Sequence, residues 1–335
     1  MEQIIKKILI IQLRRIGDVV FTLPVLDLLK RNFPNAQIDF LVEPPADELT
    51  RLNPTIHETL VYHKKEAWRW IFKIRKNKYD CVLDFHANGR SLLLTHLSGA
   101  PLKIGFEGPL TRKMIYTTCV KTDRNKFIVE QKIDLVNAIL PKKESSWVWD
   151  LKLPSQELKK AEQSLRMLGI GEKDQVIGLL PFHRHPIRAW KNEFFQQTAL
   201  MLIKQVGYKI LILCGPNEKE ILEKEINKNS EKFIIIETDS LIQMAAFLKQ
   251  CSCVIANDNG PQKIAMAVGT PTLTIFGPTN PHSINPNKFP HFYVRNEQLP
   301  CLACERNHCP YHHECMENLT PEMVLNKLNA ILKPS

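Results

Sequence analysis

Short, nearly continuous apolar runs alternate along the chain with longer segments in which apolar residues recur every three or four positions. The runs predict buried parallel strands, and the periodic segments predict amphipathic helices. In the first half, strands are expected at 8–13, 37–42, 59–62 and 80–85, helices from the loop at 14–18 to about 31 and at 126–140, and an extended segment at 147–153.

The same alternation restarts after a helix predicted at 155–168, which Gly169-Ile170-Gly171 ends. Strands are expected at 175–180, 209–214, 233–236, 253–256 and 272–276, with helices at 192–206, from about 218, and at 241–250, 262–268 and 321–332. The pattern predicts an α/β fold with two Rossmann-like domains, 1–154 and 155–335, whose parallel sheets face each other across a cleft. Ligands of such sheets bind beyond the carboxyl ends of the strands.

The length and composition are typical of a folded protein with more than one domain. At 335 residues the chain exceeds one comfortable core, and it is 44% hydrophobic and 24% charged. Because no apolar run approaches the ~18 residues of a membrane span and no signal peptide is visible, we expect a cytoplasmic protein. The net charge of +10 predicts an anionic partner, which is a nucleic acid, a phosphorylated substrate or an acidic membrane surface. The usual nucleic-acid-binding modules are not visible, so a nucleic-acid partner is not expected.

The stretch 256–281 combines a loop, a short helix of small residues and a buried strand. Asp258 and Asn259 are good helix-capping residues, and Gly260-Pro261 puts a proline at the first helical position. The open N–H groups and positive dipole end of such a helix form a natural seat for phosphate. The alternative is an ordinary αβ unit without a ligand.

The loop after the first strand carries Arg14, Arg15, Gly17 and Asp18. A carboxylate at this place is a candidate general base if a hydroxyl comes within hydrogen-bond reach. Adjacent arginines suit a phosphate or carboxylate of a substrate. The alternatives are a helix cap for Asp18 and a solvated loop for the arginines.

Two further loops follow predicted strands of the second half. The first, at 181–190, concentrates His183, Arg184, His185 and Arg188, which suits a pyrophosphate better than a metal ion because no carboxylate is nearby in sequence.

The second of these loops contains Gly215-Pro216-Asn217-Glu218. A carboxylate at such a place often binds ribose hydroxyls, and a favourable charge in a first helical turn is the equally good alternative.

Four of the nine cysteines lie in one segment, at Cys301, Cys304, Cys309 and Cys315. In a reducing cytoplasm such a cluster favours a metal site over a disulfide framework. Its spacing is not that of a standard zinc ribbon, so structural zinc, reduced thiols and a disulfide all stay open, and an iron–sulfur cluster is less favoured. We assign the cluster no catalytic part.

A basic segment at 64–78 interleaves lysines and arginines with tryptophan, isoleucine and phenylalanine. A basic helix with interfacial aromatic residues can lie on an anionic leaflet. The favoured interpretation is that this helix covers its own sheet.

Taken together, the sequence resembles glycosyltransferase family 9, the bacterial ADP-heptose:lipopolysaccharide heptosyltransferases. The cysteine-rich tail before the final helix is also similar to that of many members. The resemblance runs nearly the whole length and rests on the order and spacing of ILIIQLRRIGDVVFTLPVLDLLK, DCVLDFHANGRS, RAWKNEFF, LCGPNEKE and NDNGPQKIAMAVGTPTLTIFGPTNP.

The resemblance implies a GT-B fold with an acceptor-binding domain at 1–154. The nucleotide-sugar-binding domain at 155–335 includes the cysteine-rich segment 301–315 and the final helix 320–332. The implied activity is an inverting transfer of heptose from ADP-heptose to a lipopolysaccharide core acceptor, without a catalytic metal or cofactor. The implied partners are an ADP-sugar and an anionic glycolipid at the inner membrane leaflet, so we expect a cytoplasmic, membrane-peripheral enzyme.

Carried over by motif, the site residues have separate roles. Asp18 is the implied base, with Arg14, Arg15 and Gly17 toward the acceptor. On the donor side, Arg188 would hold the phosphates, Glu218 the nucleoside or sugar, and Asp258 the sugar hydroxyls. The backbone of Asn259, Gly260, Pro261 and Lys263 would meet the pyrophosphate.

This chain departs from the family pattern at four positions. One is Arg188, which stands where the family usually has a lysine before a tryptophan. The family usually reads Asp-Ser/Thr-Gly-Pro-x-His where this chain has Asn259 and Lys263, and some members have histidine where it has Phe21. A cation at 263 can meet a phosphate directly. The departures leave two alternatives: a transferase for another nucleotide sugar or surface glycan, and a non-catalytic binder of nucleotide sugar or glycolipid.

Overall fold

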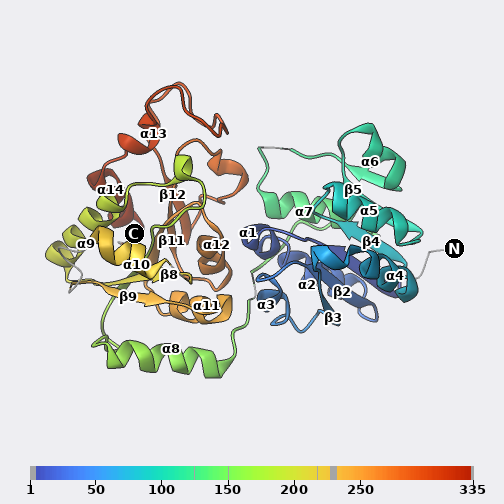
Figure 1. Cartoon of the computed structure of the whole chain (residues 1–335), viewed down its shortest axis with the longest axis horizontal. Helices are drawn as coiled ribbons and strands as arrows, with labels where there is room; N and C mark the ends of the chain where they lie inside the picture. Colours follow the sequence, from blue (N-terminus) through green and yellow to red (C-terminus); the bar gives the residue numbers. More distant parts are fainter. Residues whose placement is uncertain (1–4, 124, 150, 217, 227–231, 333–335) are drawn as a thin grey trace. The chain divides into compact units, whose positions relative to one another are not determined.

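The structure is a computed structural model that describes residues 5–123, 125–149, 151–216, 218–226 and 232–332. The chain divides into two compact units, Met1–Lys152 and Leu153–Ser335. Each unit is an α/β sandwich built on its own parallel sheet (Figure 1).

The sheet of the first unit has six parallel strands in the order β3-β2-β1-β4-β5-β6. Its strands are β1 (Lys7–Ile11), β2 (Gln37–Val42), β3 (Glu58–Val61), β4 (Cys81–Asp84), β5 (Leu102–Phe106) and β6 (Thr118–Val120). The helices are α1 (Ile16–Val20), α2 (Pro24–Asn32), α3 (Asp47–Thr50), η1 (Lys64–Glu66), α4 (Ala67–Asn77), α5 (Gly89–Leu97), α6 (Leu110–Ile115) and α7 (Ile128–Asn137).

The second unit repeats this architecture with strand order β12-β11-β10-β7-β8-β9. Its strands are β7 (Val176–Leu180), β8 (Lys209–Cys214), β9 (Ile234–Glu237), β10 (Cys253–Asn257), β11 (Thr272–Ile275) and β12 (His291–Val294). The helices are α8 (Ser155–Met167), η2 (Pro186–Arg188), α9 (Asn192–Val206), α10 (Lys219–Ile226), α11 (Leu241–Lys249), α12 (Gly260–Ala267), η4 (Pro281–Ser283), α13 (Glu314–Glu317) and α14 (Pro321–Leu332).

Helices cover both faces of each sheet, as the continuous apolar strands require. In the first unit, α2 packs with α7, and α5 packs with both α4 and α6. In the second unit, α8, α11 and α12 form one group, and α9, α10 and α14 form the other (Figure 1). The central strands β1, β4, β7 and β10 are therefore buried on both faces.

Both predicted sheets are confirmed, and the differences from expectation are local. The helix predicted to reach about 31 is two helices, because Pro24 has no N–H and begins the second one. Helix α12 begins at Gly260, so Pro261 is its second residue. No strand or helix forms at 147–153 among the described residues there, and Asp150 lies outside them. The pattern missed the three strands β5, β6 and β12.

Within the described residues, no helix is both long and apolar enough to cross a lipid bilayer.

Candidate functional site

Asp18 lies at the carboxyl edge of the first sheet, in the first turn of α1, the helix that follows β1 after a short loop. One carboxylate oxygen accepts a hydrogen bond from the backbone N–H of Arg15 at 3.4 Å. The capping interpretation is therefore correct in part. The bond is long and the residue is only half-buried, so the carboxylate still has accepting capacity for a substrate hydroxyl.

The two arginines before Asp18 differ in their surroundings. Arg14 Nε contacts Glu43 Oε2 at 2.8 Å, and Arg90 binds the other oxygen of the same carboxylate. Burial acts to raise the pKa of Glu43, but the hydrogen bonds from Arg14 and Arg90 outweigh it and hold that pKa low. Arg15 is exposed and forms no ion pair with any carboxylate of the described residues. Arg15 is thus the better placed of the two to receive an anion.

A buried lysine near Asp18 was missed by the sequence interpretation. Lys132 lies on α7 with 2% of its surface exposed, and its ammonium donates to Gln12 Oε1 at 2.9 Å. The amide of Gln12 donates in turn to the carbonyl of Arg14, in the loop that carries Asp18. Burial lowers the pKa of Lys132 to about 8, while Asp18 and Asp84 act in the opposite direction.

His86 completes this polar cluster after β4. Gln12 Nε2 lies 3.2 Å from His86 Nδ1, and a proton on Nε2 is the tautomer that lets Nδ1 accept from the amide. Nε2 is buried and has no hydrogen-bond partner among the described residues. Burial lowers the pKa of His86, so the ring is neutral near pH 7. This nitrogen is therefore a buried polar group whose hydrogen-bonding capacity is unused by the part of the chain that the structure describes.

The loop that carries His86 is held by Asp84, whose side chain is fully buried. Its carboxyl group accepts from the backbone N–H groups of His86 (3.0 Å) and Ala87 (2.9 Å) and from the Tyr116 hydroxyl (2.8 Å). Burial raises the pKa of Asp84 against these hydrogen bonds. Gly105 makes room for the Tyr116 ring, because a Cβ there would lie 2.1 Å from it.

One sequence signal could have found Lys132. Its helix neighbours Val129, Ile133 and Val136 are all buried, so the lysine interrupts an apolar face. A lysine in such a position is seldom buried without a reason, because desolvating an ammonium is expensive.

We expect Lys132→Met to be more stable than the wild type at pH 7. The pKa of Lys132 is about 8 in the fold against 10.5 as the ordinary value, so folding disfavours the charged form. The unfolded chain binds more protons between these two values, and wild-type stability from this group rises with pH across that window by about 3 kcal/mol. Urea unfolding at pH 7 and pH 10 tests this, and a variant that loses stability at pH 7 would contradict it.

In the second unit, the cap of α12 is one of the two residues that the sequence predicts. The Asn259 side chain accepts from the backbone N–H of Gln262 at 2.9 Å, so Asn259 is the helix cap. Its amide also donates to the carbonyl of Phe182 at 2.8 Å, which attaches the cap to the loop after β7. Pro261 has no N–H, so among the first-turn groups those of Asn259 and Gly260 have no acceptor in the described residues.

Lys263 does not stand free to meet a phosphate. Its ammonium lies 2.9 Å from Asp258 Oδ1, and the two side chains are 5% and 10% exposed. The same ammonium lies 3.4 Å from the carbonyl of Ile284 and above the ring of Phe276. The substitution that departs from the family pattern therefore makes a buried ion pair with the expected donor-binding carboxylate.

The loop after β7 is less cationic than its sequence indicates. Both ring nitrogens of His183 are hydrogen-bonded: Nε2 to the carbonyl of Asp258 at 2.8 Å, and Nδ1 to the backbone N–H of His185 at 2.9 Å. Burial lowers the pKa of His183, so this residue holds the loop as a neutral ring. The Arg188 side chain is 21% exposed and faces Glu305 at 3.5 Å.

Glu218 lies directly before α10 and turns back onto its own loop. Its Oε2 accepts from the backbone N–H of Gly215 at 2.8 Å. Asn217, between them, lies outside the described residues. The contact fits the local interpretation of this carboxylate.

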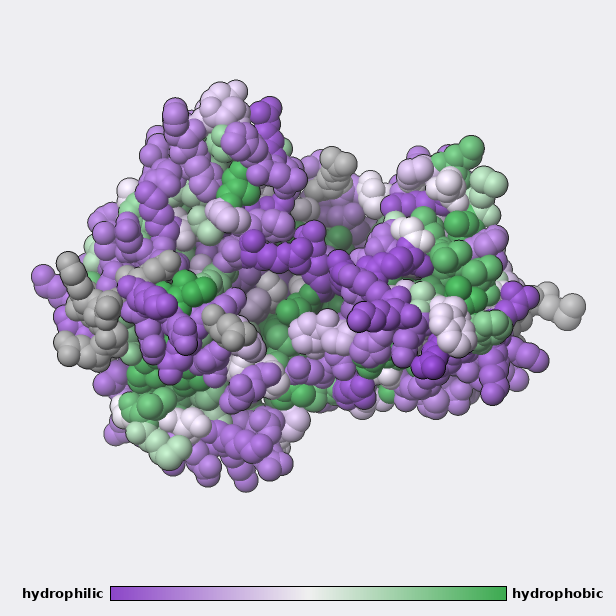
Figure 2. Space-filling view, viewed as in Figure 1, coloured by the Kyte–Doolittle hydropathy of each residue, from purple (hydrophilic) through white to green (hydrophobic). Residues whose placement is uncertain are grey.

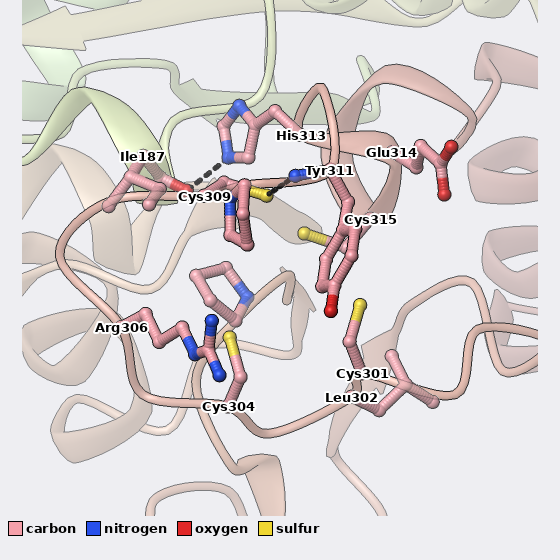
Figure 3. A pocket seen from close by; sticks show the side chains of 12 residues that line it. Ile187, Cys301, Leu302, Cys304, Arg306, Cys309, Tyr311, His313, Glu314 and Cys315 are labelled. Atoms are coloured by element: carbon pink, nitrogen blue, oxygen red, sulfur yellow. Dashed lines mark hydrogen bonds between the residues drawn. The ribbon is translucent and has the colours of Figure 1, made fainter.

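The four cysteines Cys301, Cys304, Cys309 and Cys315 line one cavity of about 190 Å³ beside the loop after β7 (Figure 3). All four are free thiols, and burial and the other three cysteines raise the pKa of Cys315 to about 11. His313 also lines the cavity and binds the carbonyl of Ile187. No three histidine, cysteine or acidic side chains of the described residues are arranged to hold a metal ion. Structural zinc therefore stays a prediction.

Comparison with known proteins identifies the family. The sequence profile of glycosyltransferase family 9 (heptosyltransferase) matches residues 67–315. A curated relative, lipooligosaccharide heptosyltransferase 2 of Campylobacter jejuni subsp. jejuni serotype O:6, is 25% identical over 95% of this chain and 97% of its own length.

Solved structures share the fold over the whole chain. The glycosyltransferase family 9 protein of Veillonella parvula has a TM-score of 0.83 at 21% identity, covering 99% of this chain and 98% of its own. The ADP-heptose lps heptosyltransferase II of E. coli has a TM-score of 0.79 at 21% identity, covering 97% and 98%. With the profile spanning most of the sequence and the GT-B architecture reproduced, the chain belongs to glycosyltransferase family 9, the heptosyltransferases, and is a glycosyltransferase.

Proposed function

We propose that this enzyme transfers heptose from ADP-heptose to a hydroxyl of a lipopolysaccharide core acceptor, with inversion at the anomeric carbon. The acceptor oxygen attacks that carbon, the bond to the phosphate oxygen breaks, and ADP leaves as an anion. The proton of the hydroxyl passes to Asp18. The products are the heptosylated acceptor and ADP, so atoms and charge balance.

On the acceptor side, Asp18 serves as the base. Its loop is tied through Gln12 to the ammonium of Lys132, which limits the movement of the carboxylate. Arg15, which is exposed, supplies a contact for an anionic, hydroxyl-rich glycolipid. Such fixed partners favour a productive geometry for proton removal.

On the donor side, the departing ADP needs positive charge. Arg188 and the open N–H groups at the start of α12 supply it from the protein, so the proposed reaction uses no catalytic metal. Glu305 faces Arg188 at 3.5 Å, so a bound pyrophosphate would replace this carboxylate as the partner of the guanidinium. Glu218 is proposed to contact the nucleoside or sugar.

The observation that carries this proposal is the family match over residues 67–315. The curated Campylobacter relative is named a lipooligosaccharide heptosyltransferase, and the E. coli structure is named for ADP-heptose. A glycolipid acceptor also suits the net charge of +10, and we propose that the enzyme works at the inner leaflet of the membrane.

We expect the purified enzyme to release ADP from ADP-heptose only when a heptose-deficient core acceptor is added. The assay measures ADP and the heptosylated product together, with the acceptor omitted as the control for hydrolysis. Binding of ADP-heptose without turnover on any core acceptor would favour the non-catalytic alternative.

A second candidate donor follows from the buried pair of Asp258 and Lys263. In this pair the carboxylate expected to hold sugar hydroxyls already has a cationic partner at 2.9 Å. A donor with a different sugar would suit that altered environment. Competition binding among ADP-, UDP- and GDP-sugars separates the two, because the leading proposal requires ADP-heptose to bind most tightly.

A further inference from the structure

Helix α4 has an inner and an outer aromatic face. Ile74 is fully buried, and Trp70 and Ile71 pack against the core of the first unit. Trp68 and Phe72 point away from it and are 60% and 69% exposed. Their rings lie edge to face, 6.4 Å apart, one helical turn from each other. The expectation that this helix simply covers its sheet therefore accounts for only one of its two faces.

The exposed apolar surface continues onto the neighbouring helices. Leu93 on α5 is 49% exposed, and Leu110 and Met114 on α6 are 73% and 76% exposed. Helix α5 packs against both α4 and α6, so these side chains belong to one side of the unit. Figure 2 shows hydrophobic surface gathered over this side. We call the surface formed by Trp68, Phe72, Leu93, Leu110 and Met114 the α4–α6 face.

Positive charge surrounds the α4 part of this face. The segment 64–78 holds seven lysines and arginines and one acidic residue, Glu66. Two of the seven cations are paired, Arg69 with Glu66 and Lys73 with Glu58. The remaining five form no ion pair with any carboxylate of the described residues, and they are Lys64, Lys65, Arg75, Lys76 and Lys78.

We propose that the α4–α6 face rests on an anionic lipid bilayer, with Trp68 and Phe72 inserted at the headgroup level and the lysines and arginines over the phosphates. Exposed aromatic side chains beside snorkelling cations are the pattern of an interfacial helix. A protein partner fits less well, because the centres of protein interfaces are depleted in lysine. The inference rests on the proposed function in one respect, since a glycolipid acceptor lies in such a bilayer.

Co-sedimentation of the full chain with vesicles tests the proposal. We expect binding to mixed phosphatidylcholine–phosphatidylglycerol vesicles that weakens with added salt, and little binding to phosphatidylcholine alone. The double variant Trp68→Ser/Phe72→Ser should lower the partition coefficient about tenfold or more, because two aromatic side chains no longer leave water. Lys64→Ser/Lys65→Ser should lower it about fivefold for each charge removed.

A matched control comes from the second unit. Met167 and Leu168 at the end of α8 are also adjacent, apolar and exposed, at 82% and 50%. Met167→Ser/Leu168→Ser should leave vesicle binding unchanged. Equal vesicle binding by wild type and Trp68→Ser/Phe72→Ser would overturn the proposal. Self-association of the wild type without vesicles, lost in that variant, would also overturn it and assign the face to a second copy of the chain.

Turnover separates this inference from the proposed function. With a detergent-solubilised acceptor, Trp68→Ser/Phe72→Ser should release ADP at the wild-type rate, because neither residue belongs to the proposed site. A wild type that binds anionic vesicles through this face but transfers no heptose would refute the function and support the surface. A wild type that transfers heptose but does not bind vesicles would support the function and refute the membrane-binding surface.

Discussion

Asp18→Asn should lower the rate of heptosyl transfer by about 10²–10⁴-fold, the usual contribution of a positioned general base. The amide has nearly the shape of the carboxylate and can still accept the hydrogen bond from the Arg15 backbone at 3.4 Å. It cannot take the proton of the acceptor hydroxyl. The loss should therefore appear in kcat measured by ADP release at saturating acceptor, with little change in the affinity for ADP-heptose.

The matched control for this variant is Asp27→Asn on α2. Asp27 is 56% exposed and pairs with Arg31 on the same helix, so its removal changes the net charge of the unit equally. We expect wild-type turnover from the control and an unchanged melting temperature for both variants. Equal turnover by Asp18→Asn and the wild type would remove Asp18 from the role of base.

Lys263→Met should destabilise the protein by about 3–5 kcal/mol, the typical cost of leaving one member of a buried ion pair without its partner. The Asp258 side chain is only 10% exposed, and the ammonium at 2.9 Å is its partner in an ion pair. The double variant Asp258→Asn/Lys263→Met removes both charges and should recover most of that loss. Denaturant unfolding of the two single variants and the double variant measures the coupling.

An exposed pair in the same unit gives the comparison for this cycle. Arg166 and Glu162 on α8 lie 2.6 Å apart but are 51% and 45% exposed. Arg166→Met should cost at most about 1 kcal/mol, because water screens such pairs. If Lys263→Met costs no more than this control, the pair with Asp258 does not support the start of α12. The buried pair would then no longer support the proposal of a different donor sugar.

Most strands were predictable because a strand that is buried on both faces of a parallel sheet has a continuous apolar sequence. The runs at 37–42 and 209–214 match β2 and β8 residue for residue, and the periodic segment 192–206 matches α9. Elements with a weak hydrophobic pattern were missed. Strand β6 has only three residues, and Lys103 interrupts the apolar run of β5.

The sequence also identified the chemistry of single loops, because the residue types that cap helices and bind anions are few. Asn259 as the cap of α12 is confirmed by its bond to Gln262, and Thr320 at the start of α14 accepts from Met323. Each of these is a local contact within three residues. Such contacts depend on sequence spacing alone and need no knowledge of the fold.

Only the tertiary structure decided which side chains from distant segments are buried together and which of them form a common surface. Lys132 meets Gln12 across 120 residues, and His183 meets the carbonyl of Asp258 across 75. The sequence located the ends of the predicted strands to within two residues and showed which polar residues follow them. It could not determine their protonation or partners, because burial and distance set these quantities and both arise only when the sheet brings the strand ends together.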